Sequence, residues 1–126
     1  GDLYIYVSLR QSSIFNREAE NLFLTAPIDL YSAINGGSIE VPSPDGKKIR
    51  ISISAGTQNG KRFRLRGKGM PILQTRSFGD LYVEAEVETP VNLTNKQKKL
   101  ISEFNENLSD NNSPKVNKFK KFLNNY

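Results

Sequence analysis

The sequence predicts a mainly β domain with one short helix, followed by C-terminal helices. Two observations carry this prediction. Up to residue 88, apolar and polar residues alternate with the period of two that is typical of β-strands. After Pro90, apolar residues recur instead at helical spacing, and the chain becomes rich in asparagine and lysine.

The expected strands are bounded by turn and helix signals. Segment 28–35, IDLYSAIN, has a helical pattern, and Gly36-Gly37 is a natural helix stop. Ser43–Gly46, with the sequence SPDG, predicts the tight turn of a hairpin, because proline presets one dihedral angle and Asp-Gly adopts the turn readily. Alternation predicts strands over residues 3–10, 21–28, 38–41, 48–53, 62–65 and 81–88.

The last third of the chain predicts two helical stretches. Thr94 and Gln97 have the spacing of a capping box, so we expect a helix to begin there and to run to about Leu108. Residues 109–114, SDNNSP, have the composition of a linker, and residues 115–126 predict a short basic amphipathic segment. The first helix carries a narrow apolar stripe that needs a partner, either the chain's own sheet or a second copy of the chain. The members of this stripe are Leu100, Ile101, Phe104 and Leu108.

The phrase GDLY occurs twice, at residues 1–4 and 79–82, and each copy opens an alternating strand. Two copies of one strand predict two copies of one module, with most of the first copy lying upstream. No turn residues precede the first copy. We therefore expect this chain to be cut from a longer one.

The composition excludes several kinds of site. Cysteine and histidine are absent, so disulfides, zinc-thiolate sites, a cysteine nucleophile and a Ser-His-Asp triad cannot form within this chain. No apolar run approaches the roughly 18 residues of a membrane span. The lack of cysteine fits a cytoplasmic protein. The net charge of +5 makes nucleic acid or an acidic partner worth considering.

The basic residues concentrate between Gly46 and Gly79, a segment without acidic residues. Strand periodicity puts Arg62, Arg64 and Arg66 on one side, the electrostatic face, and Phe63 on the other. A groove for single-stranded nucleic acid needs stacking and charge on the same face. Nucleic-acid binding is therefore the alternative function rather than the favoured one.

Two further patterns have a structural explanation that we favour. Glu84, Glu86 and Glu88 share one strand face and could hold a hard cation, but pairing across strands with the three arginines is the favoured interpretation. Segment 56–62, GTQNGKR, is similar to a phosphate-binding loop. Its glycines are too close together and an arginine stands where Ser or Thr would hold magnesium, so a turn between strands is favoured.

Several short motifs together resemble the C-terminal part of bacterial DnaJ, the co-chaperone of DnaK. The resemblance covers essentially the whole chain, and FRLRGKG at residues 63–69 is its most specific motif. The other matching motifs are IEVP at 39–42, GTQ at 56–58, GDL at 79–81, ETP at 88–90 and SPK at 113–115. The resemblance implies a small β-sandwich of the DnaJ C-terminal peptide-binding type.

The resemblance also implies a division of the chain into four parts. Residues 1–10 would be the last strand of a truncated preceding domain, and residues 11–90 the second C-terminal β-domain. Residues 91–108 would be a dimerisation helix, with Leu100, Ile101, Phe104 and Leu108 at the interface. Residues 109–126 would be a linker and a basic amphipathic tail.

The function that the resemblance implies is that of a non-catalytic co-chaperone fragment. It would form a homodimer and bind unfolded or misfolded polypeptides for delivery to a DnaK-type chaperone, without a membrane partner. No cofactor is expected, because the zinc module and the J-domain of the family are not in this chain. From strand position we expect the client-binding residues to be Leu22, Leu24, Ile39 and Val41, with membership of the ordinary core as the alternative for each. The other functions left open are a basic nucleic-acid-binding β-domain and a dimerisation module that binds no client.

Overall fold

The computed structural model describes residues 14–126, so the strand expected at residues 1–10 lies outside the described residues. The chain divides into two compact units, residues 1–90 and residues 91–126. Each unit is described by itself.

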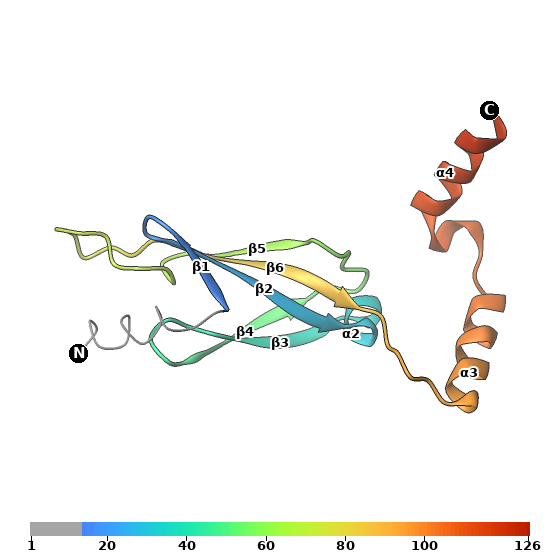
Figure 1. The fold of residues 1–126 in the computed structure, drawn as a ribbon, viewed down its shortest axis with the longest axis horizontal. Helices are drawn as coiled ribbons and strands as arrows, with labels where there is room; N and C mark the ends of the chain where they lie inside the picture. The colour runs from blue at the N-terminus through green and yellow to red at the C-terminus, as the bar shows by residue number, and fades with distance from the viewer. Residues whose placement is uncertain (1–13) are drawn as a thin grey trace. The chain divides into compact units, whose positions relative to one another are not determined.

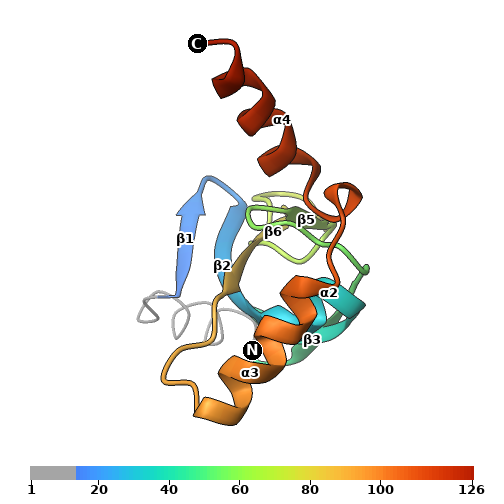
Figure 2. The same ribbon diagram turned by 90° about the vertical axis from the view of Figure 1, so that its right-hand side faces the viewer.

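The first unit consists of two β-sheets that form separate layers (Figures 1 and 2). The mainly β fold predicted from the sequence is confirmed. The four-stranded sheet has the order β1 (Phe15–Glu18), β2 (Asn21–Asp29), β6 (Leu81–Glu88) and β5 (Arg62–Leu65), and the two-stranded sheet pairs β3 (Gly37–Pro42) with β4 (Lys48–Ile53).

The strands at the centre of the larger sheet, β2 and β6, are far apart in sequence and run parallel. Parallel neighbours need a long crossover connection, and the chain between them supplies it by building the second sheet and β5. The remaining pairs are antiparallel, and β3 and β4 form the predicted hairpin. In its turn the Gly46 amide donates to the Ser43 carbonyl oxygen at 3.0 Å, and the Lys47 amide donates to the Asp45 carboxylate at 3.0 Å.

The core lies between the two sheets and is built from alternate residues of the strands. Every second side chain of β2 and β6 points into it, as strand geometry requires. The largest fully buried side chains are Leu22, Ile28, Leu81 and Val83. They come from the two central strands, and Val41, Ile51 and Ile53 of the second sheet pack in the same core.

A short helix, α2 (Leu30–Asn35), joins the two sheets at one end of the unit (Figure 1). It begins where Asp29 caps it: the Ser32 amide and hydroxyl each donate to the Asp29 carboxylate at 2.9 Å. It ends at Gly36, whose φ of 84° suits glycine. The helix expected from residue 28 begins two residues later, because Ile28 and Asp29 still pair with β6.

The second unit contains α3 (Asn95–Glu106), a 3₁₀ turn at Asp110–Asn112 and α4 (Pro114–Asn124). The predicted capping box is confirmed: the Gln97 amide donates to the Thr94 hydroxyl at 3.2 Å, and the Thr94 amide donates to the Gln97 side-chain oxygen at 2.8 Å. The linker expected over residues 109–114 is partly ordered by the 3₁₀ turn. Neither helix buries a residue.

Candidate functional site

The four side chains expected to bind clients do not form one exposed groove. Leu22, Leu24 and Val41 have exposed fractions of 1%, 7% and 2%, because they occupy inward positions of β2 and β3. Ile39 packs at the margin of the same core and is half-buried. In this conformation Ile39 is therefore the member of the four that is open to a polypeptide outside the sheets.

Ile39 lies on β3, whose outer edge has no partner strand within residues 14–126. The pairing with β4 uses one side of β3: Ile39 lies opposite Ile51, and Val41 opposite Ile49. Since each strand of a two-stranded sheet has only one neighbour, β3 and β4 each leave a row of backbone donors and acceptors unpaired by the described strands. An extended polypeptide can add to such an edge through main-chain hydrogen bonds.

Each residue of the second GDLY copy, residues 79–82, has its own structural role. Gly79 lies so close to the backbone of Glu20 that there is no room for a Cβ atom. Leu81 is fully buried in the core. Tyr82 stacks on Phe23 of the neighbouring strand, with ring centroids 5.2 Å apart. The phrase is therefore a packing motif at the start of a central strand.

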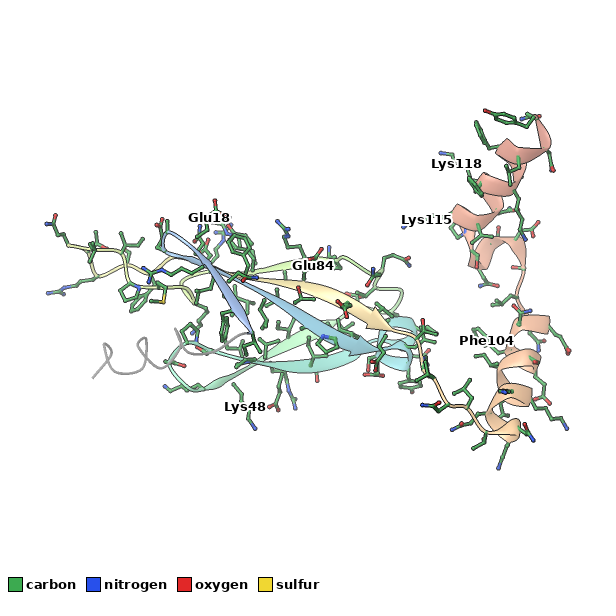
Figure 3. The ribbon with its side chains drawn as sticks, in the orientation of Figure 1. Glu18, Lys48, Glu84, Phe104, Lys115 and Lys118 are labelled. Carbon is green, nitrogen blue, oxygen red and sulfur yellow. The ribbon has the colours of Figure 1, made fainter. Side chains whose placement is uncertain are left out.

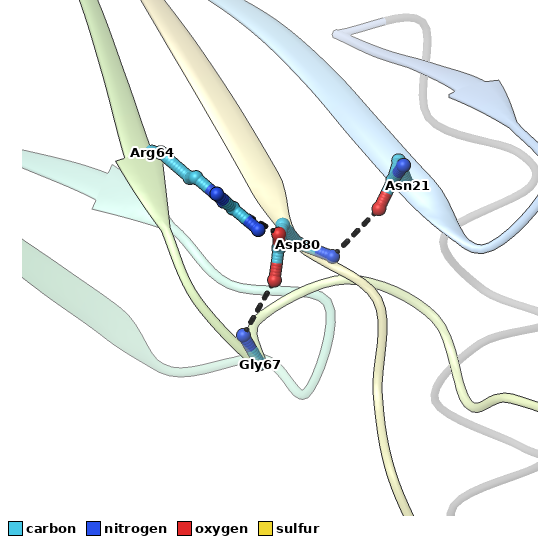
Figure 4. Close-up of polar contacts among 4 residues, drawn as sticks. All are labelled: Asn21, Arg64, Gly67 and Asp80. Atoms are coloured by element: carbon cyan, nitrogen blue, oxygen red, sulfur yellow. Dashed lines mark hydrogen bonds and ion pairs between the residues drawn. The ribbon is translucent and has the colours of Figure 1, made fainter.

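Asp80 forms hydrogen bonds with three other segments of the chain (Figure 4). Its carboxylate accepts from Arg64 Nε at 2.8 Å and from the Gly67 amide at 3.0 Å, and its own amide donates to the Asn21 side-chain oxygen at 2.8 Å. The Gly67 amide first, and then the Arg64 guanidinium, hold the pKa of the Asp80 carboxyl below its usual value. These contacts close the long loop 67–79, which extends from the end of the unit opposite α2 (Figure 1).

The electrostatic face differs in its pairing from the one expected. Arg62 lies opposite Glu84, as predicted, but Arg64 lies opposite Tyr82 and forms an ion pair with Asp80. The reason is that β5 and β6 are antiparallel, so a step forward along the arginines is a step backward along β6. The expected partners Glu86 and Glu88 lie instead opposite Pro27 and Asp29 of β2 on their other side.

An aromatic pair that the sequence analysis did not single out shares this face. Phe23 and Tyr82 are neighbours across β2 and β6, and Arg64 is the next residue across the sheet, opposite Tyr82. Phe63 packs against the core, as its periodicity predicted. Because Glu84 follows Tyr82 on the same face of β6, the face carries carboxylates as well as arginines. This mixture does not favour a polyanion.

The loop that resembles a phosphate-binding motif is a turn between β4 and β5. It borders a hollow of about 470 Å³ lined by residues 54–61 and Phe63. Several of its amides are already used: Gly56 and Thr57 donate to the Ala33 carbonyl oxygen at 2.8 and 3.0 Å, and Gly60 donates to the Ala85 carbonyl oxygen at 2.7 Å. Within residues 14–126, no three acidic side chains come close enough together to hold a metal ion.

The apolar stripe of α3 lies on one side of the helix and is open to solvent. Its members Leu100, Ile101, Phe104 and Leu108 have exposed fractions of 55%, 47%, 47% and 38%. Figure 3 labels Phe104 on this helix. The rest of α3 carries both signs of charge, with three lysines in its first half and two glutamates in its second. α3 ends at Glu106 rather than near Leu108, so three of these side chains lie on the helix and Leu108 lies two residues beyond its end. Together the four large apolar side chains form a surface that is typical of an interface.

Comparison with known proteins places this architecture in a known class. A family model described as the DnaJ C-terminal domain matches residues 1–90, and the chain belongs to this family. Among its relatives is the "Chaperone protein DnaJ" of Roseobacter denitrificans, 50% identical over 119 residues. The proteins of the same name from Azorhizobium caulinodans and Paramagnetospirillum magneticum are 49% and 51% identical over 119 and 106 residues.

These alignments cover most of this chain and a smaller part of each relative. The first two cover 94% of the chain and 31% of the relative, and the third covers 84% and 28%. The chain therefore spans about a third of the length of the chaperones that it matches.

Proposed function

We propose that the chain is a non-catalytic co-chaperone module that binds unfolded polypeptides and forms a homodimer, in a protein that delivers clients to a DnaK-type chaperone in the cytoplasm. The observation that carries the proposal is the family match over residues 1–90, which coincides with a β-unit in which the outer edge of β3 has no partner among the described strands. The relatives are named as chaperones.

The client site in this proposal is the free edge of β3 (Gly37–Pro42). Main-chain hydrogen bonds to the edge would supply affinity without demanding a particular sequence, which suits a site for many clients. Ile39 would supply an apolar contact next to the edge, because its side chain is half-buried between solvent and the core. The edge of β5 in the other sheet lies beside the charged face and offers a poorer surface to apolar segments.

The dimer in this proposal forms through the apolar stripe of α3. A stripe of this length is marginal as an isolated helix, and burial against a second copy would stabilise it. The three lysines and two glutamates of α3 leave a net charge of only +1 on each copy, so the repulsion between two copies is small. Two client edges in one particle would raise the effective concentration of the second site once the first has bound.

Solution NMR tests the client site directly. An isotope-labelled chain is titrated with a permanently unfolded, carboxymethylated protein, and amide shifts are compared between the β3 edge and the β5 edge. We expect changes over residues 37–42 and little change over the β5 residues 62–65. Changes confined to residues 62–65 would instead support the nucleic-acid or electrostatic alternative, and a full absence of changes would favour a dimerisation module without clients.

A pair of matched variants sharpens the same test. Ile39→Asp should weaken binding of the unfolded protein, because it puts a charge beside the proposed edge. Leu73→Asp makes the same chemical change at an exposed apolar residue of the loop 67–79 and should leave binding unchanged. Circular dichroism melts of both variants show whether the β-unit remains folded. Equal loss of binding in both variants would contradict the assignment of the edge.

A further inference from the structure

The helix α4 and the two residues after it form a second amphipathic surface that the proposed function does not use. Its apolar members are exposed, with fractions from 50% at Leu123 to 97% at Tyr126. The rings of Phe122 and Tyr126 lie against each other, with centroids 5.6 Å apart and planes at 57°, so these two side chains share one side of the helix. The apolar members are Val116, Phe119, Phe122, Leu123 and Tyr126.

The charged residues of this segment are all basic. Residues 114–126 contain four lysines and no aspartate or glutamate. At the helical repeat, Lys118 borders one side of the apolar arc and Lys120 borders the other, whereas Lys115, in the first turn, falls within the angular range of the arc. Lys115 and Lys118 project to the same side of α4 in Figure 3. Among the residues that the structure describes, the recorded ion pair joins Arg64 to Asp80 and involves none of these lysines.

The charged residues of α4 are all basic, whereas α3 carries both signs of charge. This difference limits which partners can bind the apolar side of α4. A second copy of α4 would bring four lysines against four lysines, and the repulsion would oppose pairing. A nucleic acid would neutralise the lysines but leave Phe119 and Leu123 in water. An anionic bilayer satisfies both faces at once, because hydrocarbon takes up the apolar arc while phosphates meet the lysines on both of its borders.

The length of α4 fixes how it would lie. Eleven helical residues extend about 16 Å, roughly half the thickness of the hydrocarbon layer of a bilayer. No helix among residues 14–126 is both long and apolar enough to cross a membrane. Against the expectation of no membrane partner that came with the resemblance, we propose that α4 is a membrane-surface helix, which lies in the plane of an anionic phospholipid bilayer with Phe119, Phe122 and Leu123 inserted and Lys118 and Lys120 at the headgroups.

The chain offers a clean spectroscopic test, because it contains no tryptophan. In the Tyr126→Trp variant of the 126-residue chain, a single indole reports on the end of the apolar arc. Vesicles of mixed phosphatidylglycerol and phosphatidylcholine are compared with vesicles of phosphatidylcholine alone. We expect a blue shift of the tryptophan emission and co-flotation of the protein with the anionic vesicles, and neither effect with phosphatidylcholine alone.

Two charge-reversal variants with the same net charge locate the effect. Lys118→Glu with Lys120→Glu, made in the Tyr126→Trp background, should weaken vesicle binding by about 30-fold or more, from the loss of two lysine contacts with the surface. Lys48→Glu with Arg76→Glu changes two exposed cations of the β-unit and should bind as the parent does. Amide shifts of β2 and β6 verify that the β-unit of each variant is folded.

Each remaining outcome overturns the proposal. The first is the absence of binding to anionic vesicles, and the second is equal weakening in both charge-reversal pairs, which would mean general attraction of a basic protein. A third is binding without a blue shift, which would leave the apolar arc unused. The last is tighter binding to a single-stranded oligonucleotide or to an acidic peptide than to vesicles of the same total charge, which would assign α4 to that partner.

Discussion

Replacing Phe104 by aspartate is the most direct test of the proposed homodimer. Phe104 lies in the middle of the apolar stripe of α3 and keeps 47% of its surface exposed. An aromatic side chain offers about 200 Å² to burial, so about 100 Å² of Phe104 is available to a partner. At about 25 cal/mol per Å², this area contributes about 2.5 kcal/mol for each copy and about 5 kcal/mol for a symmetric dimer.

The expected loss of affinity follows from this figure. About 5 kcal/mol corresponds to a dissociation constant higher by three to four orders of magnitude. The aspartate adds a cost of its own, because a charge would have to be buried without a partner. Phe104→Asp should therefore be monomeric at concentrations where the unmodified chain is dimeric. The first unit should remain folded, since Phe104 belongs to the second unit.

Sedimentation velocity over a concentration series measures this directly. Phe119→Asp is the matched control, because it makes the same change at a phenylalanine of similar exposure, 62%, on α4. The control should sediment as the unmodified chain does. A dimer that survives Phe104→Asp would refute the assignment of the stripe, and an unmodified chain that is monomeric at high micromolar concentration would refute the homodimer itself.

Three further predictions concern local contacts. Gly79→Ala should lower the free energy of unfolding by about 2–3 kcal/mol in urea titrations, because the new methyl group would overlap the backbone of Glu20; an unchanged midpoint would contradict the packing. Asp80→Asn should be less stable than the unmodified chain at neutral pH. Folding lowers the pKa of Asp80, so its stabilising contribution is complete above the usual value of 3.8 and is lost as the pH falls through the folded value. The stability of Asp80→Asn should therefore approach that of the unmodified chain in acid, and a difference that persists there would contradict the assignment. Thr94→Ala should destabilise α3 by about 1 kcal/mol, seen as faster amide exchange in α3 with no change in β6.

The secondary structure was accessible from sequence because its causes are local. Alternation, the SPDG turn and the capping box at Thr94 each act within a few residues, and each appears in the structure at the expected place. Displaced boundaries, and the strand β1 (Phe15–Glu18), which was not among the expected strands, show the limit of this reasoning. Ile28 and Asp29 have a helical pattern in sequence, but pairing with Val87 and Glu88 keeps them in β2.

Which side chains are exposed or paired at the candidate site depended more on the tertiary structure than the strands and helices did. Leu22 and Ile39 have the same apolar character in alternating strands, and sequence alone does not say which is covered. The layering of the two sheets buries Leu22 and leaves Ile39 at the margin. The stacking of Phe23 on Tyr82 also depends on a parallel pairing between strands almost sixty residues apart, a register that no local pattern encodes.

The sequence by itself determined the strands β2 to β6 and the order of the helices, the lack of cysteine and histidine chemistry, the two amphipathic C-terminal segments and the resemblance to the DnaJ family. Only the tertiary structure decided that β3 and β4 have no further partner strand within residues 14–126, and that Arg64 pairs with Asp80 rather than with a glutamate. The physical reason is that periodicity acts along a strand, whereas the register and direction of pairing are set by contacts between segments that are distant in the chain.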